Sequence, residues 1–442
     1  MLDIFGPNVG TVEGQDWQRH RKITGAVFNE QTYETVWTES LRQANGMLQW
    51  WTSQEANPIK TTAKDVRTLS LNVLAHVGFR KTYPFNGKVE NTDAREALSF
   101  RQTLCFVLDN ALLTMLVPAR FLRLPFLPFK WRQVGEAIDS LRHHMMALYN
   151  EEASSAAQDP REPANLMRRM TQASKQATHE ANTDVKNSRT THLAPKRVGL
   201  TTEEIFGNIF VYYFAGHDTT AAVFAYTMYL LAGHPEVQDW LAEELQQVLP
   251  SDDDSQWRYE DLFPRLNRCL AVMLETLRLY DPIPGVPKWT GDSDRQIQYN
   301  NQSLVVPART FVLPSLMAVH VHPRYWGADA LSWRPSRWIK TGSLPAEAGV
   351  NAECLFTPAQ GTYFPWSDGQ RNCPGKKFAQ VEFVAVIATL FRRYKVLPER
   401  MLGESEEGAQ RRVLETVDDG AVKMLLQMKD PSRVGVRWMR RE

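Results

Sequence analysis

Apolar positions recur three and four residues apart along much of the chain, which is the spacing of an α-helix that buries one face. This spacing predicts helices over Arg42–Trp51, Asp65–Val77, Gln133–Glu152, Pro235–Val248 and Leu266–Tyr280.

Strand-like patterns are fewer and shorter. Two β-branched runs, Leu304–Val306 and Thr310–Leu313, flank the pair Pro307-Ala308 and predict a hairpin. The predicted fold class is therefore mainly α with a smaller β portion (α+β).

The longest apolar stretch is Ile205–Leu231, IFGNIFVYYFAGHDTTAAVFAYTMYLL. Its length suits a membrane span, which needs about 20 apolar residues. Its centre holds His217, Asp218, Thr219 and Thr220, and an ionisable cluster in the middle of a bilayer is costly. A long helix through a protein core, polar where it meets a site, fits this pattern better, and a helical membrane protein is kept as a separate hypothesis.

The centre of that helix, AGHDTT, has features of a reactive site. Gly216 weakens the helix, and the Thr219 hydroxyl is placed to bond back to the carbonyl of Ala215, which predicts a local bulge. Asp218 and Thr219 provide the carboxylate and hydroxyl of a proton relay. A solvated helix face or a helix contact is the alternative interpretation.

Residues 153–196 are rich in Ala, Ser, Thr, Gln, Asn and charge, with little apolar periodicity. We interpret them as a flexible surface connection rather than a domain. Either Thr201 or Thr202 then caps the long helix. Neither a repeat nor a second composition regime divides the chain, so a single domain over residues 1–442 is predicted.

Charge and cysteine content exclude several classes of protein. Lys and Arg together number 51 and Asp and Glu 50, so the net charge of +1 does not favour nucleic acid as a partner. The four cysteines form neither a CxxC motif nor a Cys/His cluster, which argues against a disulfide scaffold or a zinc module. Cys105, Cys269 and Cys354 are interpreted as small hydrophobic residues.

The fourth cysteine has a different setting, FPWSDGQRNCPGKKFAQ. Pro374 suits the first position of a helix, so Cys373 is predicted at a helix N-terminus, where the dipole favours a thiolate. Gly369 and Gly375 permit close approach to a flat group, and Arg371 is placed to meet an anion on it. A thiolate against a planar dianion describes haem iron with a cysteine axial ligand.

A second motif is an acid–base pair on the helix predicted to end at Tyr280. Glu275 and Arg278 lie three residues apart and share one helix face. Arg337, in the tryptophan-rich stretch WRPSRW, is a candidate to join them in a buried Arg-Glu-Arg network, which is worth keeping where geometry must be held. An exposed pair of little energetic value is the alternative.

These motifs carry a family resemblance. PWSDGQRNCPG resembles the cysteine-ligand loop of the cytochrome P450 family, with Gly369, Arg371, Cys373 and Gly375 at motif positions. Trp366 departs from the phenylalanine that is usual in the family, but an aromatic residue beside the sulfur is preserved.

Further motifs follow in family order. AGHDTT resembles the oxygen-activation stretch of the central helix, Glu275 and Arg278 the Glu-x-x-Arg pair, and Arg337 the arginine of the meander. Trp17 and Arg21 in DWQRHR resemble a Trp-x-x-x-Arg pattern whose side chains reach a haem propionate.

The resemblance implies a haem-thiolate monooxygenase that inserts one oxygen atom of O2 into a lipophilic small molecule. Cys373 would hold the iron of heme b (iron protoporphyrin IX), Ala215 and Gly216 would contact the cofactor, and Asp218 and Thr219 would deliver protons. Electrons would come from NADPH-cytochrome P450 reductase, with cytochrome b5 as a further candidate donor. The wording of the motifs is most similar to the fungal microsomal branch, which implies secondary metabolism.

Family members have a longer region before the Trp-x-x-x-Arg helix. The expected cytochrome P450 fold is therefore N-terminally incomplete here, without an anchor, the first helices and the first sheet strands. A full-length form is expected at the cytosolic face of the endoplasmic reticulum membrane. A truncated, catalytically impaired haem-binding homologue is the alternative function.

Overall fold

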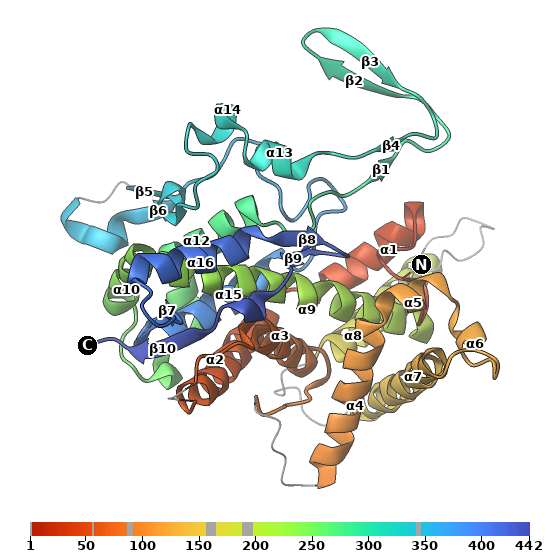
Figure 1. Cartoon of the computed structure of the whole chain (residues 1–442). Coiled ribbons are helices and arrows are strands. Elements are labelled where there is room, and N and C mark those ends of the chain that lie inside the picture. Colours follow the sequence, from red (N-terminus) through yellow and green to blue (C-terminus); the bar gives the residue numbers. More distant parts are fainter. Residues whose placement is uncertain (1, 55–56, 86–91, 156–164, 188–197, 342–345) are drawn as a thin grey trace. The chain divides into compact units, whose positions relative to one another are not determined.

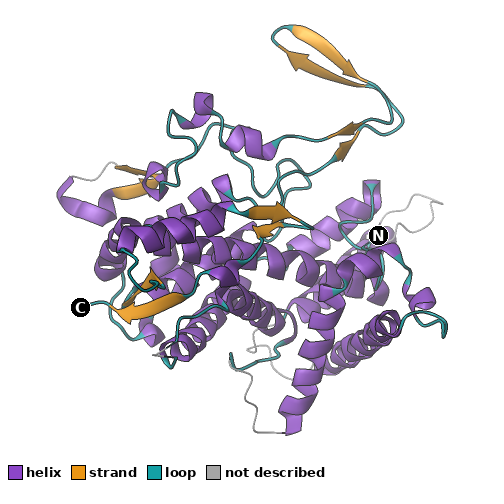
Figure 2. Cartoon of the chain, viewed as in Figure 1, coloured by secondary structure: helices purple, strands orange, loops and turns teal. Residues whose placement is uncertain are grey.

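The computed structural model describes residues 2–54, 57–85, 92–155, 165–187, 198–341 and 346–442. Its longer helices and its strands are shown in Figures 1 and 2. The α-helices are α1 (Gly14–Gly25), α2 (Glu30–Thr52), α3 (Thr62–Phe79), α4 (Thr92–Asp109), α5 (Ala111–Leu116), α6 (Ala119–Leu122), α7 (Phe129–Ser155), α8 (Leu166–Asn187), α9 (Thr202–Gly233), α10 (Pro235–Val248), α11 (Tyr259–Leu262), α12 (Asn267–Leu279), α13 (Leu316–His320), α14 (Pro323–Trp326), α15 (Lys376–Phe391) and α16 (Glu406–Asp418). The strands are β1 (Lys288–Trp289), β2 (Arg295–Tyr299), β3 (Gln302–Val306), β4 (Phe311–Val312), β5 (Ile339–Thr341), β6 (Glu353–Leu355), β7 (Tyr394–Pro398), β8 (Gly420–Val422), β9 (Leu426–Met428) and β10 (Val436–Arg440).

Contacts divide the chain into two compact units. The first unit comprises Met1–Trp50, Arg67–Asp218 and Lys377–Glu382, and the second comprises Trp51–Val66, Thr219–Lys376 and Phe383–Glu442. Helices α2, α3, α9 and α15 contribute residues to both units. The single domain over residues 1–442 stays a prediction.

The five predicted helices are confirmed and correspond to α2, α3, α7, α10 and α12. The bounds of α10 are those predicted, because Pro235 at its first turn needs no hydrogen-bond partner for a backbone N–H. The predicted fold class is confirmed as well, since helices dominate and the strands are short (Figure 2).

The long apolar stretch forms α9, and the cap in front of it is Thr201. The Glu204 N–H donates to the Thr201 hydroxyl over 3.2 Å, and the Thr201 N–H donates to a Glu204 carboxylate oxygen over 2.8 Å. This reciprocal pair is a capping box, which satisfies two backbone donors at the helix start. None of the described helices combines the length and apolar content needed to cross a lipid bilayer.

The predicted bulge within AGHDTT is wrong, because α9 continues as a regular helix through these residues. Gly216 serves packing instead. A Cβ atom built there would lie 3.2 Å from a Leu74 methyl group of α3, so the glycine lets the two helices approach closely within the first unit.

Tyr213, one turn earlier on α9, ties the same two helices together in the first unit. Its ring stacks on Phe79 with centroids 5.1 Å apart, and its hydroxyl donates to the Leu74 carbonyl over 3.0 Å. A Cβ atom at Gly78 would lie 2.2 Å from the Tyr213 hydroxyl oxygen, so only glycine fits there. The contact of α3 with α9 therefore depends on small residues on both helices.

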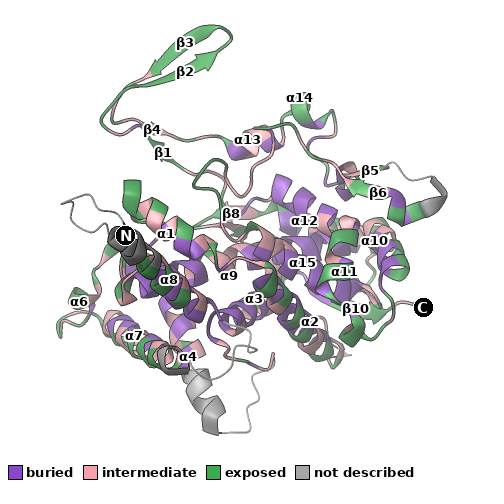
Figure 3. Cartoon of the chain, turned by 180° about the vertical axis from the view of Figure 1, so that it is seen from behind, coloured by how far each residue is buried: buried purple, intermediate pink, exposed green. Residues whose placement is uncertain are grey.

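The predicted hairpin is wrong in its pairing. Residues 304–306 and 311–312 do form strands, but β3 pairs with β2, and β4 pairs with β1. The tight turn is Asn300-Asn301, whose φ angles of 47° and 62° are those of a two-residue hairpin loop. The β2–β3 hairpin is almost entirely exposed (Figure 3).

The surface connection predicted over residues 153–196 is corrected in its middle, where the 22-residue helix α8 lies. Leu166, Met167 and Met170 are buried at the start of α8, and their spacing places them on one face. The sequence pattern does not predict this helix, because polar residues dominate the composition of the segment around these three apolar residues. Residues 156–164 and 188–197 lie outside the described part of the chain.

The second unit has an aromatic core beside α12. Leu274 of α12 packs in one buried cluster with Trp326 of α14 and Trp338, which ends the short 3-10 helix Pro335–Trp338. Tyr363 and Trp366 are partly buried against this cluster, so the segment before α15 rests on it.

Candidate functional site

Two turns shape the loop in front of α15. The Ser367 N–H donates to the Phe364 carbonyl over 2.9 Å, and the Asn372 N–H donates to the Gly369 carbonyl over 3.1 Å. Ser367 has φ 61° and Gly369 has φ 80°, both in the left-handed region. Glycine adopts this region without steric cost, whereas Ser367 costs roughly 1 kcal/mol. The backbone therefore folds back on itself just before the cysteine.

Cys373 follows these turns with its side chain exposed. Its N–H donates to the Trp366 carbonyl over 2.9 Å, and a Cβ atom at Gly375 would lie 3.8 Å from the Cys373 sulfur. The first helical residue is Lys376, so Pro374 is not the first position of the helix as predicted. Gly375 keeps non-helical angles (φ −84°, ψ 7°), which delays the start of α15.

The loop is fastened to α12 in the second unit. The Tyr363 hydroxyl donates to the Leu274 carbonyl over 2.9 Å, and the Tyr363 and Trp338 rings lie 4.6 Å apart. The Lys376 ammonium lies 5.3 Å from the centre of the Trp366 ring, a cation–π distance. Arg371 is exposed on the same loop.

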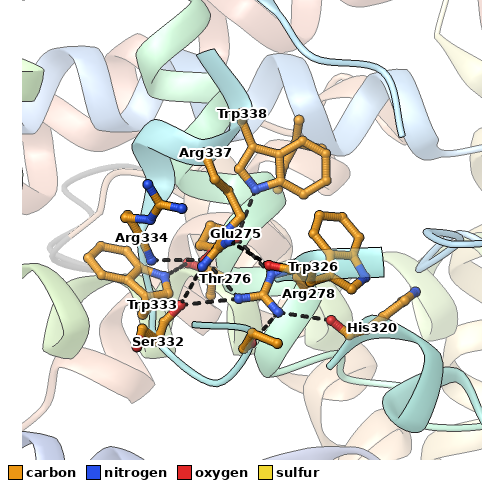
Figure 4. A network of polar contacts seen from close by, with 12 residues as sticks. Glu275, Thr276, Arg278, His320, Trp326, Ser332, Trp333, Arg334, Arg337 and Trp338 are labelled. Atoms are coloured by element: carbon orange, nitrogen blue, oxygen red, sulfur yellow. Dashed lines mark hydrogen bonds and ion pairs between the residues drawn. The ribbon is translucent and has the colours of Figure 1, made fainter. Parts of the chain in front are cut away.

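Glu275 is the centre of a buried polar network in the second unit (Figure 4). Arg278 donates to both of its carboxylate oxygens over 2.9 Å, and Arg337 donates over 2.8 Å. The Trp338 indole N–H and the Arg334 backbone N–H donate to the same carboxylate over 2.9 Å and 2.8 Å. The structure thus brings Glu275, Arg278 and Arg337 together, as the sequence predicts.

The two guanidinium groups of this network also bind backbone carbonyls. Arg278 donates to His320, over 2.8 Å, and to Ser332, over 3.1 Å. Arg337 donates to the Asp329 carbonyl over 3.0 Å and to its carboxylate over 3.2 Å. Glu275 and Arg278 have no exposed side-chain surface. Removing one partner from such a buried pair costs about 3–5 kcal/mol, so the network holds α12 and the segment 320–338 in one arrangement.

Asp218 lies in the first unit, where Arg67 and His217 contact its carboxylate. Arg67 of α3 donates to its carboxylate, and His217 Nε2 lies 3.1 Å from the same group. Arg67 also pairs with Asp109, at the end of α4, over 2.7 Å. Burial alone would raise the pKa of the Asp218 carboxyl, but the hydrogen bonds and charges of His217 and Arg67 outweigh burial and lower that pKa below its usual range. Asp218 is therefore an anion at neutral pH.

The face of α9 around Asp218 is more open than the rest of this helix. Ala215 is exposed, and Gly216, Asp218 and Thr219 are half-buried, whereas residues 204–213 are buried throughout. Asp218 ends the part of α9 in the first unit, and Thr219 begins the part in the second. These small and polar residues therefore form the accessible part of an otherwise buried helix.

Trp17 and Arg21 lie four residues apart on α1 in the first unit, both half-buried and on one face. Between them, Arg19 donates to both Glu204 carboxylate oxygens over 2.7 Å and 2.8 Å. His20 is fully buried, 3.5 Å from the same carboxylate. Glu204 of α9 thus binds α1 through Arg19 and His20, which lie between the predicted site residues Trp17 and Arg21.

The sequence patterns do not reveal three of these contacts. Arg67 lies 151 positions from Asp218, and no short motif marks it. No motif in the sequence marks Glu204 as the partner of Arg19, or His320 as a contact of the cysteine loop. Of the contacts made by Asp218, only the one with its sequence neighbour His217 could be expected from the local sequence.

The residues fit a flat, anionic, iron-bearing group. A single exposed thiol lies on a tightly turned loop, close to a glycine whose added Cβ atom would reach contact distance of the sulfur, and a buried helix follows. Thiolate is the ligand of the haem-thiolate class, and the exposed Arg371 suits a propionate. An α-rich fold with this loop and a buried Glu-Arg-Arg network fits a protein that binds haem.

Comparisons with known proteins agree. The family model described as cytochrome P450 matches residues 5–416. A cytochrome P450 monooxygenase of Arthrobotrys oligospora is 29% identical over 415 residues, covering 90% of this chain and 70% of that protein. The phomenoic acid biosynthesis cluster cytochrome P450 monooxygenase of Leptosphaeria maculans is 28% identical, covering 98% and 75%. The fold also matches a cytochrome P450 crystal structure with a TM-score of 0.69 and 17% sequence identity. The match covers all of this chain and 86% of the chain in that crystal structure.

The chain belongs to the cytochrome P450 family. It is a monooxygenase, an oxidoreductase that uses haem, O2, a small-molecule substrate and a redox partner. The predicted resemblance and fold are confirmed, including the likeness to fungal members.

Proposed function

We propose that this chain binds heme b through Cys373 and hydroxylates a lipophilic small molecule. The observation that carries the proposal is the Cys373 loop, in which two turns and one backbone hydrogen bond present a single exposed thiol ahead of a buried helix. The open stretch of α9 supports an apolar substrate, since Phe214 and Ala215 contribute accessible apolar surface there.

The cofactor contacts are assigned by residue type. Trp366 and Gly375 lie next to Cys373 on one loop and suit the face of a flat macrocycle. Ala215 and Gly216 are assigned as further cofactor contacts, because small residues permit close approach of a flat group. Trp17, Arg21 and Arg371 would bind the propionates, because charged and indole N–H groups pair well with carboxylates. The bound haem supplies reductive activation of O2, which no protein side chain provides.

Proton delivery is assigned to Asp218 and Thr219. Asp218 is an anion at neutral pH, held by Arg67, so its carboxylate accepts a proton from solvent when that pairing loosens. The Thr219 hydroxyl, next along the helix, would pass a proton toward bound O2 and take one back from solvent, so that it stays neutral. Glu275, Arg278 and Arg337 have a structural role, holding the segment against which the cysteine loop packs.

The redox partner is proposed to be an NADPH-cytochrome P450 reductase, with cytochrome b5 as a second donor. Lys376 follows the cysteine loop, and its ammonium lies over the Trp366 ring at the exposed side. Lys377 instead pairs with Glu30 in the first unit, over 2.7 Å. We therefore assign Lys376 the larger role in attracting an acidic partner.

Membrane association is proposed for the segment from α5 to the start of α7 in the first unit. Several of its apolar side chains are exposed, although Leu122 is buried; the exposed ones include Leu112, Leu116, Phe121, Phe126 and Phe129. Arginine and lysine residues alternate with them, which suits an anionic lipid surface. The proposed location is the cytosolic face of the endoplasmic reticulum membrane.

The test is the absorption spectrum of the haem-loaded, reduced protein with carbon monoxide. We expect the strongly red-shifted Soret band of a thiolate ligand, lost in Cys373→Ser and kept in Cys354→Ser. Cys354 is a matched control, because it is also exposed and lies in the second unit. Equal loss in both variants would refute the assignment of the ligand.

Haem binding without turnover is the alternative function. It gives the same thiolate spectrum but no product when a reductase, NADPH and a panel of lipophilic substrates are supplied.

A further inference from the structure

His320, the last residue of α13, is completely buried and bonds in two directions within the second unit. Its backbone carbonyl accepts from the Arg278 guanidinium over 2.8 Å, as Figure 4 shows. Its imidazole Nε2 lies 3.1 Å from the Phe364 backbone nitrogen, the first residue of the cysteine loop. One residue therefore contacts both the Glu275 network and the loop.

The chemistry of the ring makes it an acceptor. A backbone N–H can only donate, so Nε2 accepts and the proton of the neutral ring resides on Nδ1. Nδ1 has no hydrogen-bond partner among the described residues. Burial, and then the charge of Arg278, lower the pKa of His320 to about 4, so the ring is neutral at neutral pH. Contacts with the Tyr363 and Phe364 rings, at 5.2 Å and 5.5 Å, hold its orientation.

The hydrogen bonds continue from Phe364 to the thiol. The Phe364 carbonyl accepts from Ser367 and closes the first turn, and the Trp366 carbonyl, inside that turn, accepts from the Cys373 N–H. A displaced Phe364 would move the turn and therefore the acceptor that positions Cys373.

We propose that His320 is a positioning residue for the cysteine ligand. Through its imidazole, the buried Glu275–Arg278–Arg337 network restrains the loop that carries Cys373. Its consequence for the iron rests on the proposed function, in which Cys373 is the ligand. The coupling itself concerns backbone positions and is measurable without any haem signal.

The experiment compares His320→Phe with His320→Gln in the haem-loaded full chain. Phenylalanine keeps the ring volume but cannot accept, whereas glutamine places an amide oxygen near the position of Nε2. Residue-resolved hydrogen exchange is read at the amides of Phe364, Ser367 and Cys373. Because a buried N–H without a partner costs free energy, we expect exchange about tenfold faster in the phenylalanine variant and near wild type in the glutamine variant.

A second readout is the reduced carbon monoxide spectrum. We expect His320→Phe to shift part of the population from the thiolate band to the neutral-thiol band, and His320→Gln to restore the thiolate band. If the proposed ligand were wrong, this spectrum would lack the thiolate band in wild type as well, while the exchange pattern would still report on the coupling.

Two controls separate coupling from general destabilisation. His322 is exposed, and its Nδ1 accepts from the Arg324 N–H over 3.1 Å, so His322→Phe removes a comparable bond outside the loop and should change neither readout. The Val396 amide, bonded to Gln238 over 2.9 Å in the same unit, should exchange at the wild-type rate in both His320 variants. If His320→Phe does not fold, His320→Asn replaces it, because its shorter amide does not reach the Nε2 position.

Several outcomes overturn the proposal. Equal behaviour of the glutamine and phenylalanine variants, or of the glutamine and asparagine variants, would mean that the acceptor is irrelevant. Faster exchange at Phe364 without any change at Ser367 and Cys373 would mean that the contact ends at the first residue of the loop.

Discussion

Glu382 on α15 provides a sharp test of how burial governs this molecule. The side chain is completely buried, and neither carboxylate oxygen has a hydrogen bond among the described residues. Burial raises the pKa of Glu382 to about 8, and the nearby Ser70 hydroxyl, which lies outside hydrogen-bond geometry, lowers it by a smaller amount. At neutral pH the group is therefore mostly protonated.

The pH dependence of stability follows from this value. In the unfolded chain the pKa of this carboxyl is near its usual value of 4.5, and in the folded chain it is about 8. Its contribution to stability is fully present below pH 4.5 and is lost as the pH rises through 8, because the folded state retains the proton over this interval. The free energy of unfolding falls by about 1.4 kcal/mol per pH unit, or about 5 kcal/mol over 8 − 4.5 = 3.5 units.

The assay is urea unfolding between pH 5 and pH 8.5, followed by circular dichroism, in wild type and Glu382→Gln. Glutamine keeps the shape but does not titrate, so the difference between the two free energies of unfolding isolates this group. We expect the difference to change steadily with pH in favour of the glutamine variant. Glu407→Gln is the control, since Glu407 is exposed on α16 and should follow wild type. Parallel curves for wild type and Glu382→Gln would refute the reasoning.

Three further predictions concern the site. Arg67→Gln removes the guanidinium beside Asp218, so the pKa of Asp218 should rise. The pH profile of coupled product formation should then move to higher pH. An unchanged profile would exclude a role of Arg67 in proton delivery. Thr219→Ala should retain haem but raise oxygen consumption per product, and unchanged coupling would withdraw the role of Thr219. Glu275→Ala leaves the buried Arg278 without its carboxylate partner, at a cost of about 3–5 kcal/mol. The urea midpoint of unfolding and the haem content should both fall. Wild-type values for both would show that the network is dispensable.

The sequence was most informative where a local pattern has a local cause. The helix Pro235–Val248 was predicted to the residue, because a proline at its first turn and regular apolar spacing both act within the helix. Glu275 and Arg278 share a face for the same reason, and tryptophans around Arg337 indicated a buried partner. The cysteine loop was recognisable because its turns need glycine at a particular position, as Gly369 shows.

The errors arose where the outcome depends on contacts with distant residues. The strands at 304–306 and 311–312 were found, but their partners were not, since the Asn300-Asn301 turn decides which runs pair. Helix α8 was missed because three buried apolar residues at its start outweigh a polar composition only when a neighbouring surface covers them.

Local sequence was enough to predict the family, the α-rich class, the cysteine on its turn-rich loop and the acid–base pair on α12, because each depends on residues close together in the chain. The fold was needed to show that Arg67 holds Asp218 as an anion, that His320 joins the Glu275 network to the cysteine loop, and that Glu382 has no hydrogen-bond partner among the described residues. The physical reason is common to all three. Charge state and hydrogen bonding depend on which groups surround a side chain, and in a folded chain those groups come from distant parts of the sequence.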